Sequence, residues 1–109
     1  MDDNFKDCID QCLQCISVCN ACAIACLNET HVGHLSKCIS LDLECAEVCS
    51  AAAAVMSMNG VISKKLCAVC ADICDQCAAE CSKHKDMGHC AACAETCAAC
   101  AAACRKMAA

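Results

Sequence analysis

The stretch that decides the fold is CIDQCLQCISVCNACAIAC, residues 8–26. Successive cysteines in it are separated by steps of 4, 3, 4, 3 and 4 residues, at Cys8, Cys12, Cys15, Cys19, Cys22 and Cys26. Steps of three and four return to the same face of an α-helix, whereas a β-strand would need steps of two. The stretch therefore predicts a long helix that carries one continuous stripe of thiols.

The same spacing recurs twice toward the C-terminus. Two segments offset by 23 residues repeat it, as Cys67, Cys70, Cys74, Cys77 and Cys81 and as Cys90, Cys93, Cys97, Cys100 and Cys104. The segment before them keeps the register with fewer cysteines, namely Cys38, Cys45 and Cys49. Its stripe passes through Asp42 and continues through Ala52 to Met56. One pattern therefore runs through four helical segments.

Turn-forming residues separate these four segments. Gly33, the pair Asn59-Gly60 and Gly88 stand between them, and glycine and asparagine readily adopt the left-handed conformation that ends a helix. We expect helices at roughly 3–28, 34–58, 62–84 and 88–107. Because the connections are short, neighbouring helices should be antiparallel. The sequence thus predicts an all-α fold, a single domain over residues 1–109 that forms an antiparallel up-down-up-down four-helix bundle with the cysteine stripes facing the core.

The composition narrows the class of protein. The chain has 109 residues, a formal net charge of -5 and no Trp or Tyr, which argues against nucleic-acid binding through phosphate neutralisation or base stacking. We find neither a long uncharged run of bulky apolar residues nor an apolar segment after the acidic start, so neither a membrane span nor a cleaved signal is expected. A cytoplasmic location follows as the default. Thiols stay reduced there, and cysteine patterns indicate metal or redox chemistry before disulfides.

The number of cysteines points to metal binding. A core of 19 cysteines serving only as small hydrophobic side chains would bury little apolar area, whereas thiols at i, i+3 and i, i+4 form ready pairs of metal ligands. Four-thiolate zinc sites would accumulate negative charge in the core, but Cu(I) bound to bridging thiolates can approach one ion per sulfur with the charge cancelled. We expect multiple Cu(I) ions, roughly 15 to 20 per chain.

Two alternatives to copper remain open, namely zinc storage and a thiol redox buffer. Disulfides between neighbours on one regular helix have unfavourable geometry. Cysteine and histidine occur together, but the sequence shows no third group that would orient them for nucleophilic catalysis, so an enzyme is not expected.

These ladders make the chain resemble the cytosolic bacterial copper storage proteins, and the likeness covers essentially its whole length. The matching residues are Cys8 to Cys26, Cys38 to Cys49, Cys67 to Cys81 and Cys90 to Cys104. The resemblance implies a four-helix bundle, commonly a homotetramer, whose interior fills with Cu(I) ions held by cysteines. Copper donor or acceptor proteins are candidate partners, and the sequence leaves open whether stored copper is passed to a partner or simply detoxified.

Aliphatic residues flank the cysteine stripes of the first two segments. In the predicted bundle they would either seal the seams between helices or face a second subunit. They are Ile9, Leu13, Ile16, Leu35, Ile39 and Leu43.

The two ends of the bundle should differ chemically. Alternating helix directions bring His31, His34, His84, Met87 and His89 to one end, called here the histidine end. His34 and His84 extend cysteine stripes toward solvent, so we place them ahead of His31 and His89 as ligands that receive Cu(I) at this end. Solvated loop histidines are the alternative.

Two further features concern the stripe and the opposite end. Asp42 replaces a cysteine one turn inside the histidine end, where it would be either a ligand or a buried carboxylate with a partner. The opposite end, called here the methionine end, gathers Phe5, Met56, Met58 and Met107. We expect these four residues to form mainly an apolar plug, with Met107 as a candidate terminal ligand.

Overall fold

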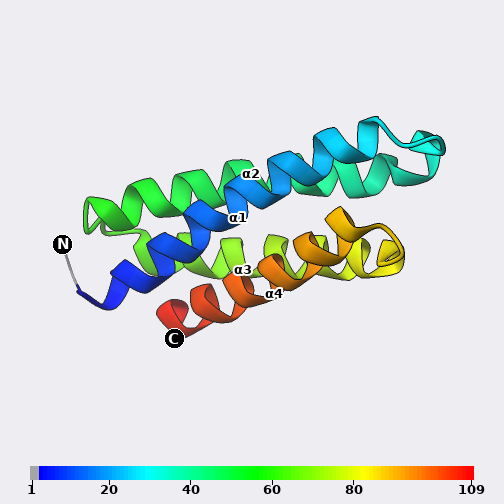
Figure 1. Cartoon of the computed structure of the whole chain (residues 1–109). Coiled ribbons are helices and arrows are strands. Elements are labelled where there is room, and N and C mark those ends of the chain that lie inside the picture. The colour runs from blue at the N-terminus through cyan, green and yellow to red at the C-terminus, as the bar shows by residue number, and fades with distance from the viewer. Residues whose placement is uncertain (1–2) are drawn as a thin grey trace.

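Four α-helices connected by short loops make up the chain, whose computed structural model describes residues 3–109 (Figure 1). The helices are α1 (Asp3–Leu27), α2 (Ser36–Ser57), α3 (Ser63–Cys81) and α4 (Gly88–Ala108). Two short 3-10 helices, η1 (Val32–Leu35) and η2 (Ser82–His84), lie in the loops before α2 and after α3. No strand occurs among the described residues.

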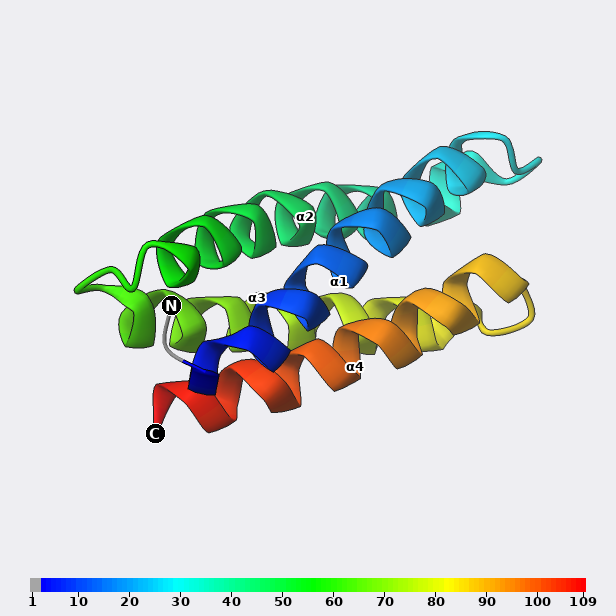
Figure 2. The same cartoon turned by 60° about the vertical axis from the view of Figure 1, so that its left-hand side comes forward.

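The helices form an antiparallel bundle, as the sequence predicts. Each packs against two neighbours, in the pairs α1 with α2, α2 with α3, α3 with α4 and α4 with α1. The α1–α2 and α3–α4 loops lie together at the histidine end, and the α2–α3 loop lies at the methionine end beside the start of α1 and the end of α4 (Figures 1 and 2). The bundle measures 44 × 18 × 17 Å.

The turn between α2 and α3 depends on two residues that the sequence analysis singles out. Asn59 has a φ of 52°, in the left-handed region. The backbone N–H of Gly60 donates to the carbonyl oxygen of Val55 at 2.9 Å, and a Cβ on Gly60 would lie 2.6 Å from the Cγ1 of Val55. The hydroxyl of Ser63 donates to the carbonyl oxygen of Gly60 at 2.7 Å. A larger residue at position 60 would therefore require the side chain of Val55 to move and the turn to adjust.

The cysteines face inward from all four helices. All 19 are buried and none forms a disulfide. Alanines fill much of the remaining interior, among them Ala23, Ala52 and Ala101, each 1% exposed or less. The interior is therefore a column of thiols with few large aliphatic side chains, and the predicted inward stripes are confirmed.

The helix α1 is apolar enough to resemble a membrane segment. By length and composition alone, Phe5–Leu27 could span a bilayer. Its cysteines are nevertheless buried against the other helices of the bundle. The core helix of a soluble protein can have this same length and composition.

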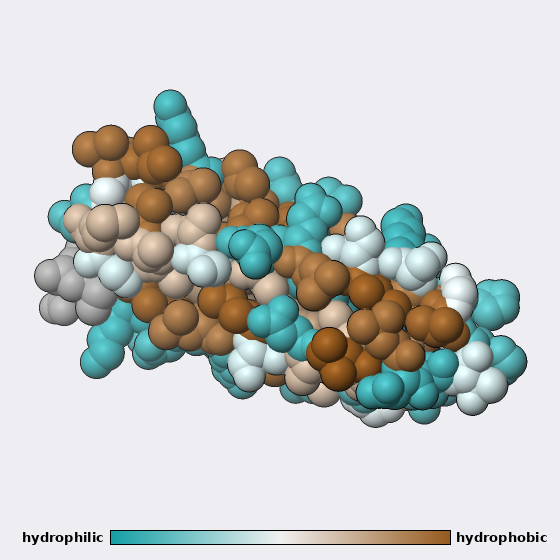
Figure 3. Space-filling view, turned by 90° about the horizontal axis from the view of Figure 1, so that it is seen from above, coloured by the Kyte–Doolittle hydropathy of each residue, from teal (hydrophilic) through white to brown (hydrophobic). Residues whose placement is uncertain are grey.

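The aliphatic residues beside the stripes fall into two groups. Ile9 and Leu35 are buried and seal seams of the bundle. Leu13 and Leu43 are 53% and 49% exposed. Exposed hydrophobic residues are visible on the face seen in Figure 3, the α1 and α2 side of the bundle, where polar residues interrupt them. Part of this set therefore remains on the surface.

Candidate metal centre

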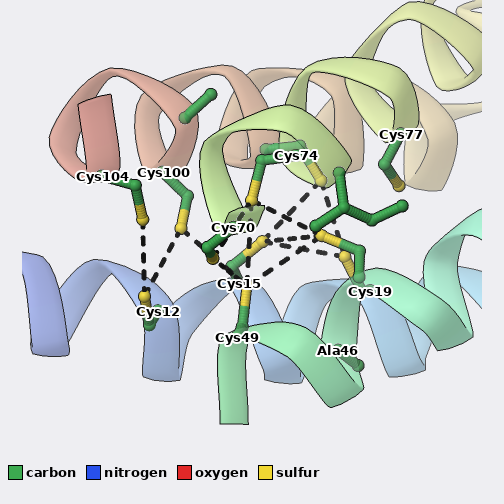
Figure 4. Packing of buried hydrophobic residues seen from close by; sticks show 14 of the residues in the cluster. Cys12, Cys15, Cys19, Ala46, Cys49, Cys70, Cys74, Cys77, Cys100 and Cys104 are labelled. Atoms are coloured by element: carbon green, nitrogen blue, oxygen red, sulfur yellow. Dashed lines mark hydrogen bonds between the residues drawn. The ribbon is translucent and has the colours of Figure 1, made fainter. Parts of the chain in front are cut away.

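The thiols form a continuous array along the bundle axis. The Sγ atom of Cys15 lies 3.8 Å from that of Cys19 one turn away, 3.9 Å from that of Cys45 on α2 and 3.8 Å from that of Cys97 on α4. Figure 4 shows such sulfurs from different helices pointing toward one another. Each cysteine thus has neighbours on its own helix and on adjacent ones.

Several groups of four sulfurs are close enough to bind one metal ion. Within each group the ligand atoms lie within 4.8 Å of one another. The groups include Cys12, Cys49, Cys70 and Cys100; Cys15, Cys49, Cys74 and Cys100; Cys15, Cys19, Cys45 and Cys97; and Cys19, Cys77, Cys93 and Cys97. Because the groups share members, filling them all requires sulfurs that bridge two or more ions.

Burial keeps two thiols at opposite ends of the array, those of Cys26 and Cys67, protonated when no metal is bound. It raises the pKa of Cys26 to about 11 and, together with the neighbouring charge of Cys8, the pKa of Cys67 to about 12. Metal binding must therefore displace protons, and uptake should release them to the solvent.

Asp42 occupies the interior of the array. Its side chain is 0% exposed. Its Oδ1 accepts from the thiols of Cys77 at 3.1 Å, Cys93 at 3.2 Å and Cys81 at 3.6 Å, and its Oδ2 from Cys38 at 3.9 Å. Burial, and then the charge of Cys93, raise the pKa of Asp42 to about 8. Thiols thus supply the hydrogen-bond partners of the carboxyl group. Its oxygens lie close enough to these thiols to contact a metal ion bound by them.

His89 is the histidine that contacts the thiols. Its Nδ1 lies 3.5 Å from the Sγ of Cys90, 3.6 Å from that of Cys22 and 3.8 Å from that of Cys26. Its Nε2 is hydrogen-bonded to the carboxylate of Glu29 at 3.0 Å. A carboxylate on one ring nitrogen orients the other nitrogen toward a metal, and these four ligands form one of the metal-sized groups.

The cysteine spacing alone gives little reason to expect His89 beside the thiols. Its position next to Cys90 takes it off the stripe, but α4 begins at Gly88, so His89 stands in the first turn at the end of the bundle. From there its ring reaches across to α1. The signal available in the sequence was the acidic Glu29 in the facing loop.

His84 and His34 lie apart from these thiols. His84 forms a hydrogen bond through Nε2 with the Oε2 of Glu80 at 3.1 Å. Glu80 is only 7% exposed and also pairs with Lys83 at 3.3 Å and Lys37 at 3.9 Å. The cysteine spacing does not indicate this buried carboxylate, because Glu80 stands beside the stripe and is covered by Lys37, Lys83 and His84.

An open depression of about 500 Å³ lies at the histidine end. His31, His34, His84 and Met87 line it, and the rings of His31 and His34 lie 6.1 Å apart, edge to face. The structure thus brings the predicted residues to one end, with His34 exposed to solvent. Whether His34 and His84 bind metal stays a prediction.

The methionine end is sealed by only part of the predicted plug. Phe5 is 9% exposed and Met56 is 0% exposed, and Met107 packs half-buried against the core. The prediction for Met58 is wrong, since this side chain is 71% exposed. The helix α2 ends at Ser57, and Met58 follows the stripe position of Met56 by two residues, which turns it away from the interior.

Comparisons with known proteins point to one family. The sequence model of the copper storage protein family (Csp) matches residues 1–109. The uncharacterized cysteine-rich protein YhjQ of Bacillus subtilis (strain 168) is 47% identical over 109 residues, covering 100% of both chains.

Solved structures give the same result. The structure of the Cu(I)-bound copper storage protein BsCsp3 is 47% identical, with a TM-score of 0.94, covering 98% of this chain and 100% of that one. A cytosolic copper storage protein from Streptomyces lividans, solved during copper loading with five coppers, is 41% identical, with a TM-score of 0.91 and coverage of 97% and 92%.

Proposed function

The chain belongs to the copper storage protein family, and we propose that its core stores roughly 15 to 20 Cu(I) ions on shared thiolates. The observation that carries this proposal is that the metal-sized groups share their sulfurs. The proposed ligands are Cys8, Cys12, Cys15, Cys19, Cys22, Cys26, Cys38, Cys45, Cys49, Cys67, Cys70, Cys74, Cys77, Cys81, Cys90, Cys93, Cys97, Cys100 and Cys104.

The charge of the core favours copper over zinc. Each Cu(I) ion that replaces one thiol proton leaves the net charge unchanged, so a core with as many ions as thiolates is neutral. Zinc bound to four thiolates would carry about two negative charges per site, and the described core holds no basic side chain to offset them. The dense array of soft ligands therefore suits Cu(I).

Copper enters at the histidine end in this proposal. His89 and the thiols of Cys22, Cys26 and Cys90 form the outermost complete set of ligands, with His34 and His84 in the adjoining depression as transient ligands. Asp42 lies one turn further in and binds an ion together with the thiols that contact it. The ion then passes from sulfur to sulfur along the array.

The chain is proposed to work as a homotetramer in the cytoplasm. Leu13, Ile24, Leu27 and Leu43 leave apolar surface exposed on α1 and α2, and a second copy would cover it. Storage needs no catalysis, and no enzymatic activity is expected. Copper donor and acceptor proteins are proposed to meet the chain at the histidine end, with no role for nucleic acid or a membrane.

An anaerobic titration tests the proposal. Fully reduced protein is titrated with Cu(I) in competition with a chromophoric Cu(I) chelator, and a parallel sample is titrated with Zn(II). Uptake approaching one Cu(I) per cysteine, with much less Zn(II), is expected. A plateau at one to four ions, or preference for Zn(II), would redirect the function toward zinc storage or a thiol redox buffer.

A further inference from the structure

At the methionine end of the bundle, each of the four helices contributes one buried sulfur atom. Cys8 of α1, Met56 of α2, Cys67 of α3 and Cys104 of α4 are all buried there. The Sγ of Cys8 lies 3.7 Å from that of Cys104, and the Sγ of Cys67 lies 3.5 Å from the Sδ of Met56. One of these four sulfurs is a thioether.

Met56 stands in the register of the metal-binding stripe. The α2 stripe runs through Cys38, Asp42, Cys45, Cys49, Ala52 and Met56 with the same steps that separate the six cysteines of α1. Met56 therefore occupies the position that Cys26 occupies in the first helix. Its side chain is 0% exposed, and Phe5 covers the same end of the core.

Cys67 differs from the other thiols in its neighbours. Among residues 3–109, the sulfur of Cys67 has one sulfur contact within hydrogen-bonding distance, and that contact is Met56. The central thiols, such as Cys15 and Cys49, each contact three or more other thiols. For an ion bound at Cys67, the Met56 thioether is thus the nearest second sulfur, with the thiol of Cys8 also close by.

We propose that Met56 is a copper ligand and that its thioether and the thiolate of Cys67 bind the Cu(I) ion farthest from the histidine end. This inference rests on the proposed storage of Cu(I) in the same core. On binding, the Cys67 thiol loses its proton to the solvent, and one thiolate and one neutral thioether complete a site with no net charge. Thioethers are soft ligands that suit Cu(I), whereas zinc is bound by thiolate, imidazole and carboxylate.

A matched pair of substitutions tests the role of Met56. Met56→Leu keeps the volume and apolar character of the side chain but removes the sulfur, so the bundle should fold as before. Met58→Leu makes the same change at an exposed side chain on the same helix end. After saturation with Cu(I) under anaerobic conditions, native mass spectrometry counts the ions on each chain.

The expected result is one Cu(I) fewer on the Met56→Leu variant and the full number on Met58→Leu. Cys67→Ser should also lose one ion, and the double variant Met56→Leu/Cys67→Ser should lose that same single ion and no second one. A full count on Met56→Leu would overturn the proposal. If the unmodified chain holds few Cu(I) ions, the storage function itself fails, which is a separate result.

A second readout distinguishes ligation from packing. Methyl-13C labelling of the five methionines gives one NMR signal each, and the signal lost in Met56→Leu identifies Met56. Cu(I) saturation should move this signal far more than that of Met58, and Zn(II) should leave it in place. An unmoved Met56 signal in the copper-loaded chain would overturn the proposal even if the variant binds fewer ions.

Discussion

Glu29 holds His89 by a 3.0 Å hydrogen bond from the loop after α1, and thereby directs the other nitrogen of the ring at three thiols. The pair joins α1 to the first turn of α4 at the histidine end. An oriented imidazole nitrogen therefore lies beside the sulfurs of Cys22, Cys26 and Cys90 at this end, where it is a candidate metal ligand.

Loss of this nitrogen should weaken copper capture at the histidine end. His89→Ala should slow Cu(I) uptake and lower capacity by at most one ion, because the thiols further inside remain. Glu29→Gln should have a smaller effect in the same direction, with the affinity of the first ion reduced by about tenfold. Stopped-flow transfer from a Cu(I)–chelator complex measures the rate, with Lys106→Ala, a change at an exposed residue of the methionine end, as control. Equal rates for His89→Ala and the control would contradict this role.

Asp42 should make the stability of the metal-free chain depend on pH. Its pKa is about 8 in the folded chain against an ordinary value of 3.8. Between these values the unfolded chain has lost a proton that the folded chain keeps, so the free energy of unfolding falls as pH rises. Asp42 thus lowers the free energy of unfolding by on the order of a few kcal/mol at pH 8, and this destabilisation vanishes below pH 4.

Asp42→Asn removes this titration while keeping the shape of the side chain. The metal-free variant should therefore be more stable than the unmodified chain at pH 8 and equally stable at pH 3.5. Urea unfolding followed by circular dichroism, with a chelator and a reductant present, gives both values. A variant that is less stable at pH 8 would show that the thiols favour an ionised carboxylate.

Single thiols in the middle of the array should be replaceable. Cys19 lies 3.5 Å from Cys97 and 3.8 Å from Cys15. If ions share these sulfurs, Cys19→Ser should lose about one Cu(I) and keep the rest, since neighbouring thiolates rearrange around the gap. Titration and the far-ultraviolet circular dichroism spectrum check capacity and fold, with the exposed Ser17→Ala as control. Loss of most of the copper would indicate one cooperative cluster instead.

The exposed leucines of α1 and α2 should control assembly. Leu43→Glu places a charge on the apolar surface proposed to meet a second copy, and burial of an unpaired charge is costly. The variant should sediment as a smaller species than the unmodified chain. Val69→Glu changes a similarly exposed residue on α3 and should leave the assembly intact. Dissociation by Val69→Glu alone would move the interface to the other side of the bundle.

The spacing of the cysteines was enough to predict the helices and the inward stripes, and the short connections predicted the antiparallel order of the helices. A repeat of three and four residues leaves no other regular structure that would put all the thiols on one side. Helix ends were less predictable, because η1 and η2 continue the chain direction without α-helical hydrogen bonds. The exposure of Met58 was missed for a different reason, because α2 ends at Ser57 and Met58 lies two residues past the stripe position of Met56.

Contacts between side chains of different helices could not be predicted from the cysteine repeat. His89 and Glu80 both stand beside a cysteine and therefore off the stripe. Each gains its role from residues on other elements, Glu29 for His89 and Lys37 for Glu80. Helical periodicity describes one helix at a time, so it ranks such residues low even where the packed bundle makes them important.

The metal content of the chain in cells tests the central claim most directly. The protein is isolated anaerobically from cells grown with added copper and zinc together, and native mass spectrometry is recorded at once. We predict a series of copper-loaded species that extends to roughly 15 to 20 ions per chain, with little zinc. Species that carry up to four zinc ions, or chains that have lost two hydrogens for each disulfide formed, would contradict storage of Cu(I) on shared thiolates.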